Sequence, residues 1–545
     1  MTASWLPLPA GDLQVEVMDI NLSGGERGAL RPVIARALRL APSPNLSRRS
    51  LLEAVPLIVI CLLPVVLYLP FVRAPFERDE GVYATIAQGL LDGRVPYRDL
   101  FDNKPPLVYG WYAFSFLLFG ESVVAPRIVA AVLLSFTTLS LFSQARMMYP
   151  RGVAYAAAGM FAVSTGLPWV ALHANTEAYM LLPLVASLLA FTIGMRRDSL
   201  PWFLLAGALG GLAMMTKQVA VWNLIALAVV VLGWRWRASG GGWRSVTPAL
   251  CLVTGAAAAT ALVALPFVAA GAVDDLVYAN VSYNWLYVGA LSFGQRLFQM
   301  GAFFLLFFGV AAPLVAGALA GLLLAWRRRS RVTHYLLVLW ALASVAGVAS
   351  GGQFFPHYFM QLLPAMAVLT AVVIYDRWRR QGMRLIGRPT LVATALLIAI
   401  SLTTNAILYF TPEEAEQRVY EPIFHQEQWE SASRSLGAYI AQRTSPEDTI
   451  FNYGREAQIY FYADRGPAVP YFYDWALWYD KSALSQTMGA LRQEKPVYII
   501  DSLLPPIFKD YPQYHPPAFM ALLSEDYDYV GRVYFADVYR LKERS

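Results

Sequence analysis

The sequence has few charged residues and almost no cysteine. Charged residues make up 15% of the 545 residues, whereas hydrophobic residues make up 57%. A soluble domain usually has about 25% charged residues and cannot bury so large an apolar share. The two cysteines, Cys61 and Cys251, both lie in apolar runs, and they support neither a disulfide framework nor a zinc site. These scarcities predict a polytopic membrane protein.

Apolar runs of about membrane-spanning length recur along the chain. A helix needs roughly 20 apolar residues to cross a hydrocarbon core of about 30 Å. Eleven spans are predicted, at about 52–70, 123–148, 152–171, 178–195, 200–216, 218–234, 247–270, 300–325, 333–350, 358–375 and 389–409. The weakest point is 200–234, where one long helix would bury Lys217 near the middle of the membrane, at about 3 kcal/mol. A hairpin with Lys217 at its outer tip avoids that cost.

Arginine clusters between the spans predict the orientation. Short loops rich in arginine stay in the cytoplasm. The clusters comprise Arg36, Arg39, Arg48 and Arg49; Arg146 and Arg151; Arg196 and Arg197; Arg235, Arg237 and Arg244; Arg327 to Arg329 with Arg331; and Arg377, Arg379, Arg380 and Arg384. All fit one topology with a cytoplasmic N-terminus and, after eleven spans, an extracytoplasmic C-terminus. Because this positive charge is spread among loops, the net charge of +6 does not indicate nucleic-acid binding.

Three regions differ in character. Residues 1–50 lack the order of a signal peptide and are predicted to be a disordered cytoplasmic tail, with a misplaced start codon as the alternative. Residues 51–410 are predicted to form the transmembrane domain. Residues 411–545 alternate helical and strand-like patterns, including 448–453, 496–501 and 529–541, which predicts a small extracytoplasmic α/β domain.

The first outer loop, about 71–122, is long and charge-balanced, so it can cross the membrane despite its basic residues. Val82, Tyr83, Ile86, Ala87 and Leu90 follow a helical period. This stripe predicts a helix lying in the membrane interface. The segment 271–299 is expected to behave similarly. The fold class is therefore an α-helical polytopic membrane protein with interfacial helices in its first outer loop and a small C-terminal α/β domain.

In this topology, acids, bases and amides gather at the outer ends of the spans, as in a reaction site. They are Asp79-Glu80, Asn103-Lys104-Pro105-Pro106, His173 to Glu177, Lys217, Gln353 and His357-Tyr358. Lysine suits a lipid phosphate, and a carboxylate can take a proton from an attacking hydroxyl.

Each of these residues also has a purely structural interpretation. Asp79 is a favoured helix-cap residue, with Glu80 in the first turn. Lys104 is equally consistent with a kinked entry to the next span, and Glu177 with the first turn of the fourth span. Lys217 could be a solvated tip, and His357 an interfacial histidine. The aromatic run 460–479 is more typical of a domain core or a headgroup contact than of a sugar platform.

Several of these segments resemble a known family. The runs Phe76 to Ala84, Ile86 to Leu91, Lys104 to Leu107, Phe119-Gly120 and Ala125 to Arg127 resemble the first outer loop of C-superfamily glycosyltransferases of the protein O-mannosyltransferase and aminoarabinose transferase type. The segment Gly211 to Lys217 and the pair His357-Tyr358, with Pro364, are similar to later landmarks. The resemblance covers about residues 50–380, while the C-terminal domain resembles that of bacterial members.

The resemblance implies a bacterial inner-membrane enzyme that uses a polyprenyl-phosphate-linked sugar as donor. It would transfer a hexosyl or pentosyl group, with inversion, to a lipid, glycan or protein acceptor at the extracytoplasmic face. Asp79 and Glu80 map onto the catalytic pair. Lys104, Lys217 and His357 would bind the donor phosphate. Asn103, Glu177 and Tyr358 would contact substrate. A divalent cation, Mg²⁺ or Mn²⁺, bridging Asp79 and Glu177 to the phosphate stays open.

Two other activities remain open, and so does a degenerate enzyme that only scaffolds a complex. A flippase or transporter of lipid-linked sugars would place its polar groups near the middle of the membrane, in broken helices and repeats. A ligase that moves whole glycans from a pyrophosphate carrier would favour more arginines at the outer ends. Product analysis distinguishes the three, because a transporter makes no glycosidic bond and a ligase moves more than one sugar.

Overall fold

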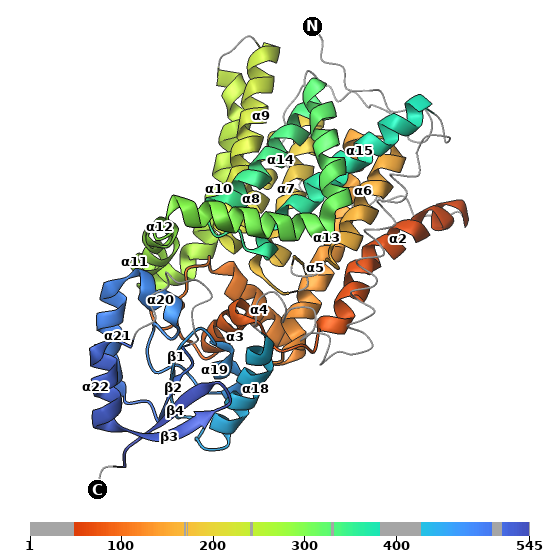
Figure 1. Ribbon diagram of the computed structural model, residues 1–545. Coiled ribbons are helices and arrows are strands. Elements are labelled where there is room, and N and C mark those ends of the chain that lie inside the picture. The colour runs from red at the N-terminus through yellow and green to blue at the C-terminus, as the bar shows by residue number, and fades with distance from the viewer. Residues whose placement is uncertain are drawn as a thin grey trace, which may run out of the picture. The chain divides into compact units, whose positions relative to one another are not determined.

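The computed structural model describes residues 48–167, 170–171, 173–239, 243–328, 332–381, 427–503 and 515–543. Most of the predicted cytoplasmic tail, 1–50, and the predicted span 389–409 lie outside these residues. The described chain is mainly helical, and a small sheet follows near its C-terminus (Figure 1).

Within the described residues, eight helical segments are long and apolar enough to cross a membrane. They are Ala54–Phe71, Val124–Met148, Thr176–Arg197, Gln218–Trp236, Ser245–Ala269, Phe293–Arg327, Val332–Ser350 and Pro356–Arg379. All eight coincide with predicted spans. The chain is a multi-pass membrane protein.

Two further predicted spans are shorter helices. The run 200–216 is the apolar helix α8 (Leu200–Thr216), whose 17 residues are at the lower limit for crossing a membrane. The run 152–171 is wrong in extent: α6 (Arg151–Ser164) has 14 residues, and helical structure ends near Thr165. A helix of that length covers only about 21 Å.

The hairpin predicted around Lys217 is present. Helix α8 ends at Thr216, a short 3₁₀ turn η2 (Gln218–Ala220) follows, and α9 (Val221–Ser239) runs on. Glycines bring α8 against α10 (Trp243–Ala269): a Cβ at Gly207 would collide with the Leu252 carbonyl, and one at Gly255 with the Leu204 carbonyl. Small residues at such crossings let membrane helices approach closely.

The arginine-rich helix ends meet at one end of the membrane helices. Arg196, at the end of α7 (Thr176–Arg197), donates to the Met147 carbonyl near the end of α5 (Val124–Met148). Arg235 pairs with Asp198 after α7, and Arg328, after α13, lies 3.0 Å from Asp376 in α15 (Leu363–Gln381). Glu177 and Lys217 lie at the opposite ends of their helices. The arginine-rich helix ends and the ends that carry Glu177 and Lys217 are therefore separated in space.

The segment 71–122, predicted to be the first outer loop, holds two helices of different character. Helix α3 (Arg78–Leu91) has nine buried residues among its 14, including Gly81 and Thr85 on the side away from the predicted apolar stripe. The prediction that the apolar stripe of α3 contacts the membrane interface is therefore wrong, because protein covers the helix. An unpredicted helix, α4 (Leu107–Phe119), instead exposes Leu117 and Phe119. Its 13 residues span only about 20 Å, which suits a helix at the membrane interface.

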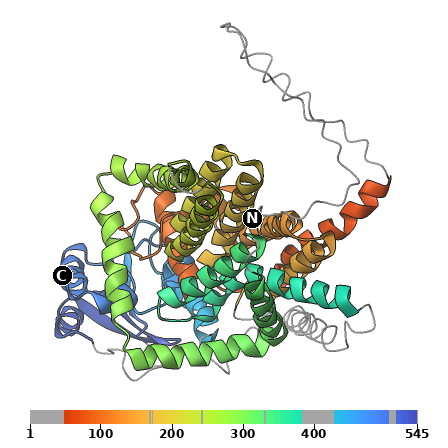
Figure 2. The same ribbon diagram turned by 90° about the horizontal axis from the view of Figure 1, so that it is seen from above.

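The segment predicted at 271–299 is also helical. α11 (Val273–Val277), a π-helical turn η3 (Tyr278–Ser282) and α12 (Tyr283–Gly289) follow one another, and α13 (Phe293–Arg327) begins after Ser292. Figure 2 shows Val273–Gly289 and the first half of α13 as consecutive arms along the edge of the helices. Non-helical backbone at Ala311, next to Pro313, marks the change of direction within α13.

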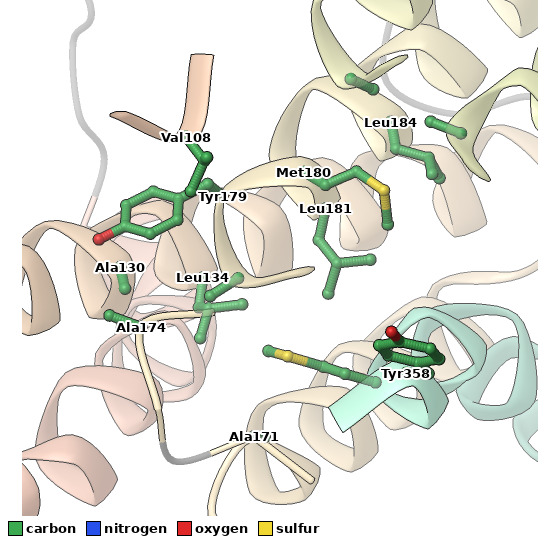
Figure 3. Close-up of a cluster of buried hydrophobic side chains, with 14 of the residues drawn as sticks. Val108, Ala130, Leu134, Ala171, Ala174, Tyr179, Met180, Leu181, Leu184 and Tyr358 are labelled. Atoms are coloured by element: carbon green, nitrogen blue, oxygen red, sulfur yellow. The ribbon is translucent and has the colours of Figure 1, made fainter. Parts of the chain in front are cut away.

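Apolar packing joins several of the helices near the predicted site residues. Figure 3 shows Met180 and Leu181 of α7 in one buried cluster with Val108 of α4 and Leu134 of α5. Tyr358 lies in the same cluster. It belongs to the 3₁₀ turn η4 (Pro356–Leu362), which follows α14 (Val332–Ser350). This packing places η4 beside the beginning of α7.

The C-terminal region forms a four-stranded mixed sheet in the order β1-β2-β4-β3. β1 (Ile450–Tyr453) pairs in parallel with β2 (Tyr498–Asp501), and β4 (Ala536–Leu541) pairs antiparallel with both β2 and β3 (Tyr527–Val533). The predicted strands at 448–453 and 496–501 are confirmed, whereas the predicted strand 529–541 is a hairpin. The helices of this region are α18 (Glu427–Ala441), α19 (Gln458–Ala463), α20 (Asp474–Tyr479), α21 (Lys481–Glu494) and α22 (Pro517–Asp526).

Candidate functional site

The N-terminal turn of α3 carries three consecutive charged residues, Arg78, Asp79 and Glu80. Glu77 occupies the N-cap position, and the Glu80 carboxylate accepts its backbone N–H at 3.1 Å. The structural interpretation of Asp79 as the cap residue is therefore wrong. Asp79 lies in the first turn, where the helix dipole favours a carboxylate. Its side chain is free to serve another purpose.

Glu80 is fully enclosed by the protein. Both of its oxygens accept from Arg127, at 3.0 Å from Nε and 2.5 Å from Nη2, and the backbone N–H of Ala174 donates at 2.8 Å. Burial alone would raise the pKa of Glu80, but Arg127 and His173 hold it well below its usual range. Arg127 also donates to the carbonyls of residues 71, 74 and 75. Glu80 thus ties α3 to α5 and to the loop before α7.

Asp79 is oriented differently from its neighbour. Its side chain is 39% exposed, and the carboxylate Oδ2 lies 4.0 Å from Nε2 of His357. His357 stacks on the Phe355 ring and meets the Tyr358 ring edge-on, with centroids 6.0 and 4.8 Å apart. The accessible carboxylate of this turn is therefore the one next to the histidine of η4.

Lys217 reaches the same histidine–tyrosine pair from α8. Its ammonium forms an ion pair with the buried carboxylate of Glu177 in the first turn of α7, and it lies 3.9 Å from the centroid of the Tyr358 ring. The side chain is only 6% exposed, so the interpretation as a solvated tip is wrong. Asn175 occupies the N-cap position of α7, which confirms that Glu177 lies in the first turn of that helix. Glu177 also pairs with Lys217. A cation held against an aromatic face and a carboxylate is fixed in place.

Lys104 supplies the second cation. Its ammonium donates to the Asn103 side-chain oxygen at 2.9 Å. Burial lowers the pKa of Lys104, but the carboxylates of Asp102 and Asp79 raise it to a net value well above the usual one, so the ammonium stays charged at neutral pH. Gln218 and Asn284 both donate to the Asn103 carbonyl, at 2.9 and 3.1 Å.

The predicted site residues therefore divide into two groups. Six of them surround one place on the molecule, contributed by α3, the 103–104 loop, α7, α8 and η4: Asp79, Lys104, Glu177, Lys217, His357 and Tyr358. Asn103 supports Lys104 from beside them. Glu80, which was predicted to be catalytic, makes its described contacts with protein groups instead.

Sequence reasoning missed a row of aromatic rings beside this cluster. Phe355 lies 6.4 Å from Trp475 of α20, and Trp475 lies 5.4 Å from Tyr287 of α12. Tyr283 donates its hydroxyl to the Trp475 carbonyl at 2.7 Å. Of the aromatic run 460–479, Tyr460 and Phe472 are buried in the domain core, as expected. Trp475 instead borders the site, which only the packing of the C-terminal domain reveals.

The carboxylates at the site do not form a metal-ligand cluster. Among the described residues, no group of three or more His, Cys, Asp or Glu side chains is arranged to hold a metal ion. Glu177, one of the two predicted ligands, is engaged by Lys217. We therefore assign no metal-dependent step to these residues.

The fold and the site define a multi-pass membrane protein with an accessible carboxylate, two lysines and a histidine at one end of its helices. Residues 103–267 match the family described as dolichyl-phosphate-mannose-protein mannosyltransferase. The match covers this segment alone, which is therefore similar to that family of membrane glycosyltransferases.

Individual relatives are distant. The chain is 27% identical over 325 residues to an undecaprenyl phosphate-alpha-4-amino-4-deoxy-L-arabinose arabinosyl transferase of Pseudomonas aeruginosa, covering 55% of this chain and 56% of that protein. The enzyme of the same name from Pseudomonas paraeruginosa is 26% identical over 377 residues, covering 65% and 63%. The chain thus matches less than two thirds of the length of these relatives.

A solved structure shows the same fold. The crystal structure of ArnT from Cupriavidus metallidurans bound to undecaprenyl phosphate aligns with a TM-score of 0.56 at 17% identity, covering 89% of this chain and 97% of that one. The likeness therefore includes both the membrane helices and the C-terminal domain.

Proposed function

We propose that the protein transfers a sugar from a polyprenyl-phosphate donor to an acceptor hydroxyl, with inversion, at the extracytoplasmic face of a bacterial cytoplasmic membrane. The observation that carries this proposal is the convergence of Asp79, Lys104, Lys217 and His357 from four separate segments. The family match and the named donor chemistry of the relatives support the same reaction.

Asp79 is the proposed base. The acceptor hydroxyl attacks the anomeric carbon and loses its proton to the Asp79 carboxylate. The bond between that carbon and the phosphate oxygen breaks, and its electron pair leaves with the polyprenyl phosphate. A base must come within hydrogen-bond distance of the hydroxyl, and the exposed fraction of Asp79 allows that approach.

The two lysines offset the charge that develops on the leaving phosphate, which is often the largest single contribution to catalysis. Lys104 is the stronger candidate, because its ammonium is bound to a neutral amide, whereas Glu177 already neutralises Lys217. His357 lies between Asp79 and Tyr358 and would donate to the donor phosphate or the sugar. Glu80 holds the turn that carries Asp79, so we propose for it a positioning role.

The proposed orientation follows from the separation of charges. Short arginine-rich connections remain cytoplasmic, and their helix ends lie opposite the site. We infer the full eleven-span topology, which would put the N-terminus in the cytoplasm and the C-terminal domain outside. Reporter fusions after residue 92 and at the C-terminus should both report an extracytoplasmic position, and fusions that report opposite sides would contradict the proposal.

Product analysis tests the function. Purified protein in bilayers would receive polyprenyl-phosphate sugars and an extract of cell-envelope lipids and glycans, and mass spectrometry would follow the products. The proposal predicts a new glycosidic bond, a mass increase of one sugar and release of polyprenyl phosphate. Movement of intact donor across the bilayer without a new bond would indicate a transporter. Transfer of a whole glycan from a pyrophosphate carrier would indicate a ligase.

A further inference from the structure

Arg78, the residue before the proposed base, is directed away from the site. Its Nε lies 2.8 Å from Oε1 of Glu456 in the C-terminal domain. The Glu456 side chain is fully buried, and its other oxygen accepts from the Gln458 amide at 2.6 Å. Removing one partner of a buried ion pair leaves a buried charge uncompensated, which is strongly destabilising. This pair therefore joins the two domains firmly.

Backbone packing reinforces the same contact. A Cβ at Gly81 would lie 2.6 Å from both the Cβ and the backbone nitrogen of Gln458, so only glycine fits there. The Thr85 hydroxyl is within 3.3 Å of the Ala457 carbonyl, and the backbone N–H of Phe76 donates to the Tyr462 hydroxyl at 2.7 Å. The first turns of α3 are seated directly on α19 and the residues before it.

The three charged residues of this turn consequently have three different partners. Successive residues of an α-helix project about 100° apart, because there are 3.6 residues per turn. Arg78 is anchored to the C-terminal domain, Glu80 is anchored to Arg127 in the membrane domain, and Asp79 lies between these anchors facing His357. Neither anchor touches the proposed reacting groups, but together they restrict rotation of the turn.

We infer that Glu456 is a positioning residue for Asp79, and that the C-terminal domain fixes the proposed base through the Arg78–Glu456 pair. This inference rests on the proposed function. A catalytic group must be held close to its productive geometry, and a displacement of about 1 Å can cost roughly 100-fold in rate.

The test compares two carboxylates of the C-terminal domain in the full-length protein. Glu456→Gln removes the buried partner of Arg78. Glu525→Gln removes the partner of Arg492 in an exposed pair and serves as the matched control. Three quantities are measured: single-turnover transfer at saturating donor, affinity for polyprenyl phosphate, and hydrogen exchange of the backbone amides of α3.

The inference predicts that Glu456→Gln slows transfer by about 10- to 100-fold, leaves polyprenyl-phosphate affinity within about twofold, and speeds exchange at the start of α3. Glu525→Gln should change none of these. Arg78→Gln should slow transfer about as much as Glu456→Gln. The double variant should show little additional loss, because both changes remove the same ion pair. Unchanged transfer in Glu456→Gln, or additive losses in the double variant, would overturn the inference.

Two provisions keep the result interpretable. Should Glu456→Gln fail to fold, Arg78→Lys retains the charge at a partly exposed position and should give a smaller loss of the same kind, whereas full activity with unchanged exchange would count against the pair. Should the wild-type protein transfer no sugar, the proposed function fails, and the hydrogen-exchange comparison still shows whether Glu456 holds the α3 turn.

Discussion

The first turn of α3 meets protein on two sides that are built differently. On the membrane-domain side, Glu80 receives both Arg127 donors and a backbone N–H, and Arg127 is itself bound to three carbonyls. On the C-terminal side, Arg78 pairs with the buried Glu456 but keeps 17% of its side chain exposed, and Gly81 and Thr85 of the same helix pack against Gln458 and Ala457. A fully buried ion pair therefore holds the turn on the first side, and a partly exposed ion pair with close backbone packing holds it on the second.

The largest expected change in stability follows from removing the Glu80–Arg127 ion pair on the membrane-domain side. Glu80→Gln leaves Arg127 buried without its charge partner, which should cost about 3–5 kcal/mol. Because the pKa of Glu80 is lowered, this stabilisation is present at neutral pH and is lost only as the pH falls below the usual carboxyl range. Thermal unfolding in detergent should show a clear drop in midpoint.

The control for this comparison is Glu121→Gln. Glu121 is exposed, and it accepts one hydrogen bond from Gln88 of α3. Its replacement should change the unfolding midpoint little. Equal midpoints for Glu80→Gln and the wild-type protein would show that the membrane-domain side is not the stronger of the two.

The next largest effect is expected at Lys104. Lys104→Ala removes a charged donor to the proposed phosphate, worth about 1.5–3 kcal/mol, or roughly 10- to 100-fold in donor affinity. Acceptor use at saturating donor should fall much less. Binding of polyprenyl phosphate and steady-state transfer would be compared with Lys495→Ala, which removes a lysine paired with Asp526 in the C-terminal domain. Equal losses for donor and acceptor would contradict the assignment.

A smaller effect on donor binding is expected at Lys217, because Glu177 already offsets its charge. Lys217→Met should weaken polyprenyl-phosphate binding by only a few fold, yet destabilise the protein by leaving Glu177 buried and unpaired. Adding Glu177→Gln should restore stability without restoring binding. Binding and unfolding assays on the same preparations check both parts. A loss of binding larger than that of Lys104→Ala would reverse the proposed ranking of the lysines.

The stability of the C-terminal domain should also depend on pH. Burial raises the pKa of Asp474 to about 6, although Arg455 and Arg78 oppose the shift. The folded state therefore holds this proton more tightly than the unfolded state, so the stability from Asp474 falls as pH rises from about 4 to about 6. The shift corresponds to roughly 3 kcal/mol. Asp474→Asn should flatten unfolding curves across this window, whereas exposed Asp464→Asn should not. The same slope in both variants would contradict the burial argument.

Much of the site could be predicted from the sequence, because its members lie at the ends of recognisable spans. The arginine-rich loops predicted which helix ends share a side of the membrane. That prediction put Asp79, Lys217 and His357 on the same side. Lys217 could be assigned to a hairpin tip, since a buried midspan lysine is costly.

Other features depend on contacts between residues far apart in the sequence. Nothing near Glu80 in the chain shows that Arg127 will occupy both of its oxygens. Glu456 and Trp475 belong to a domain whose packing on α3 cannot be read from local periodicity. The interfacial prediction for α3 was wrong for the same reason: an apolar stripe looks alike whether lipid or another domain covers it. The two anchors of Asp79 therefore emerge only from the tertiary structure.

The most direct test of the central claim is single-turnover transfer by Asp79→Asn, with donor binding measured on the same preparation and Asp92→Asn, at the exposed end of α3, as the control. The account predicts that Asp79→Asn folds and binds donor like the wild-type protein but transfers sugar at least about 100-fold more slowly, as expected on loss of a general base. Near-normal transfer by Asp79→Asn would contradict the account.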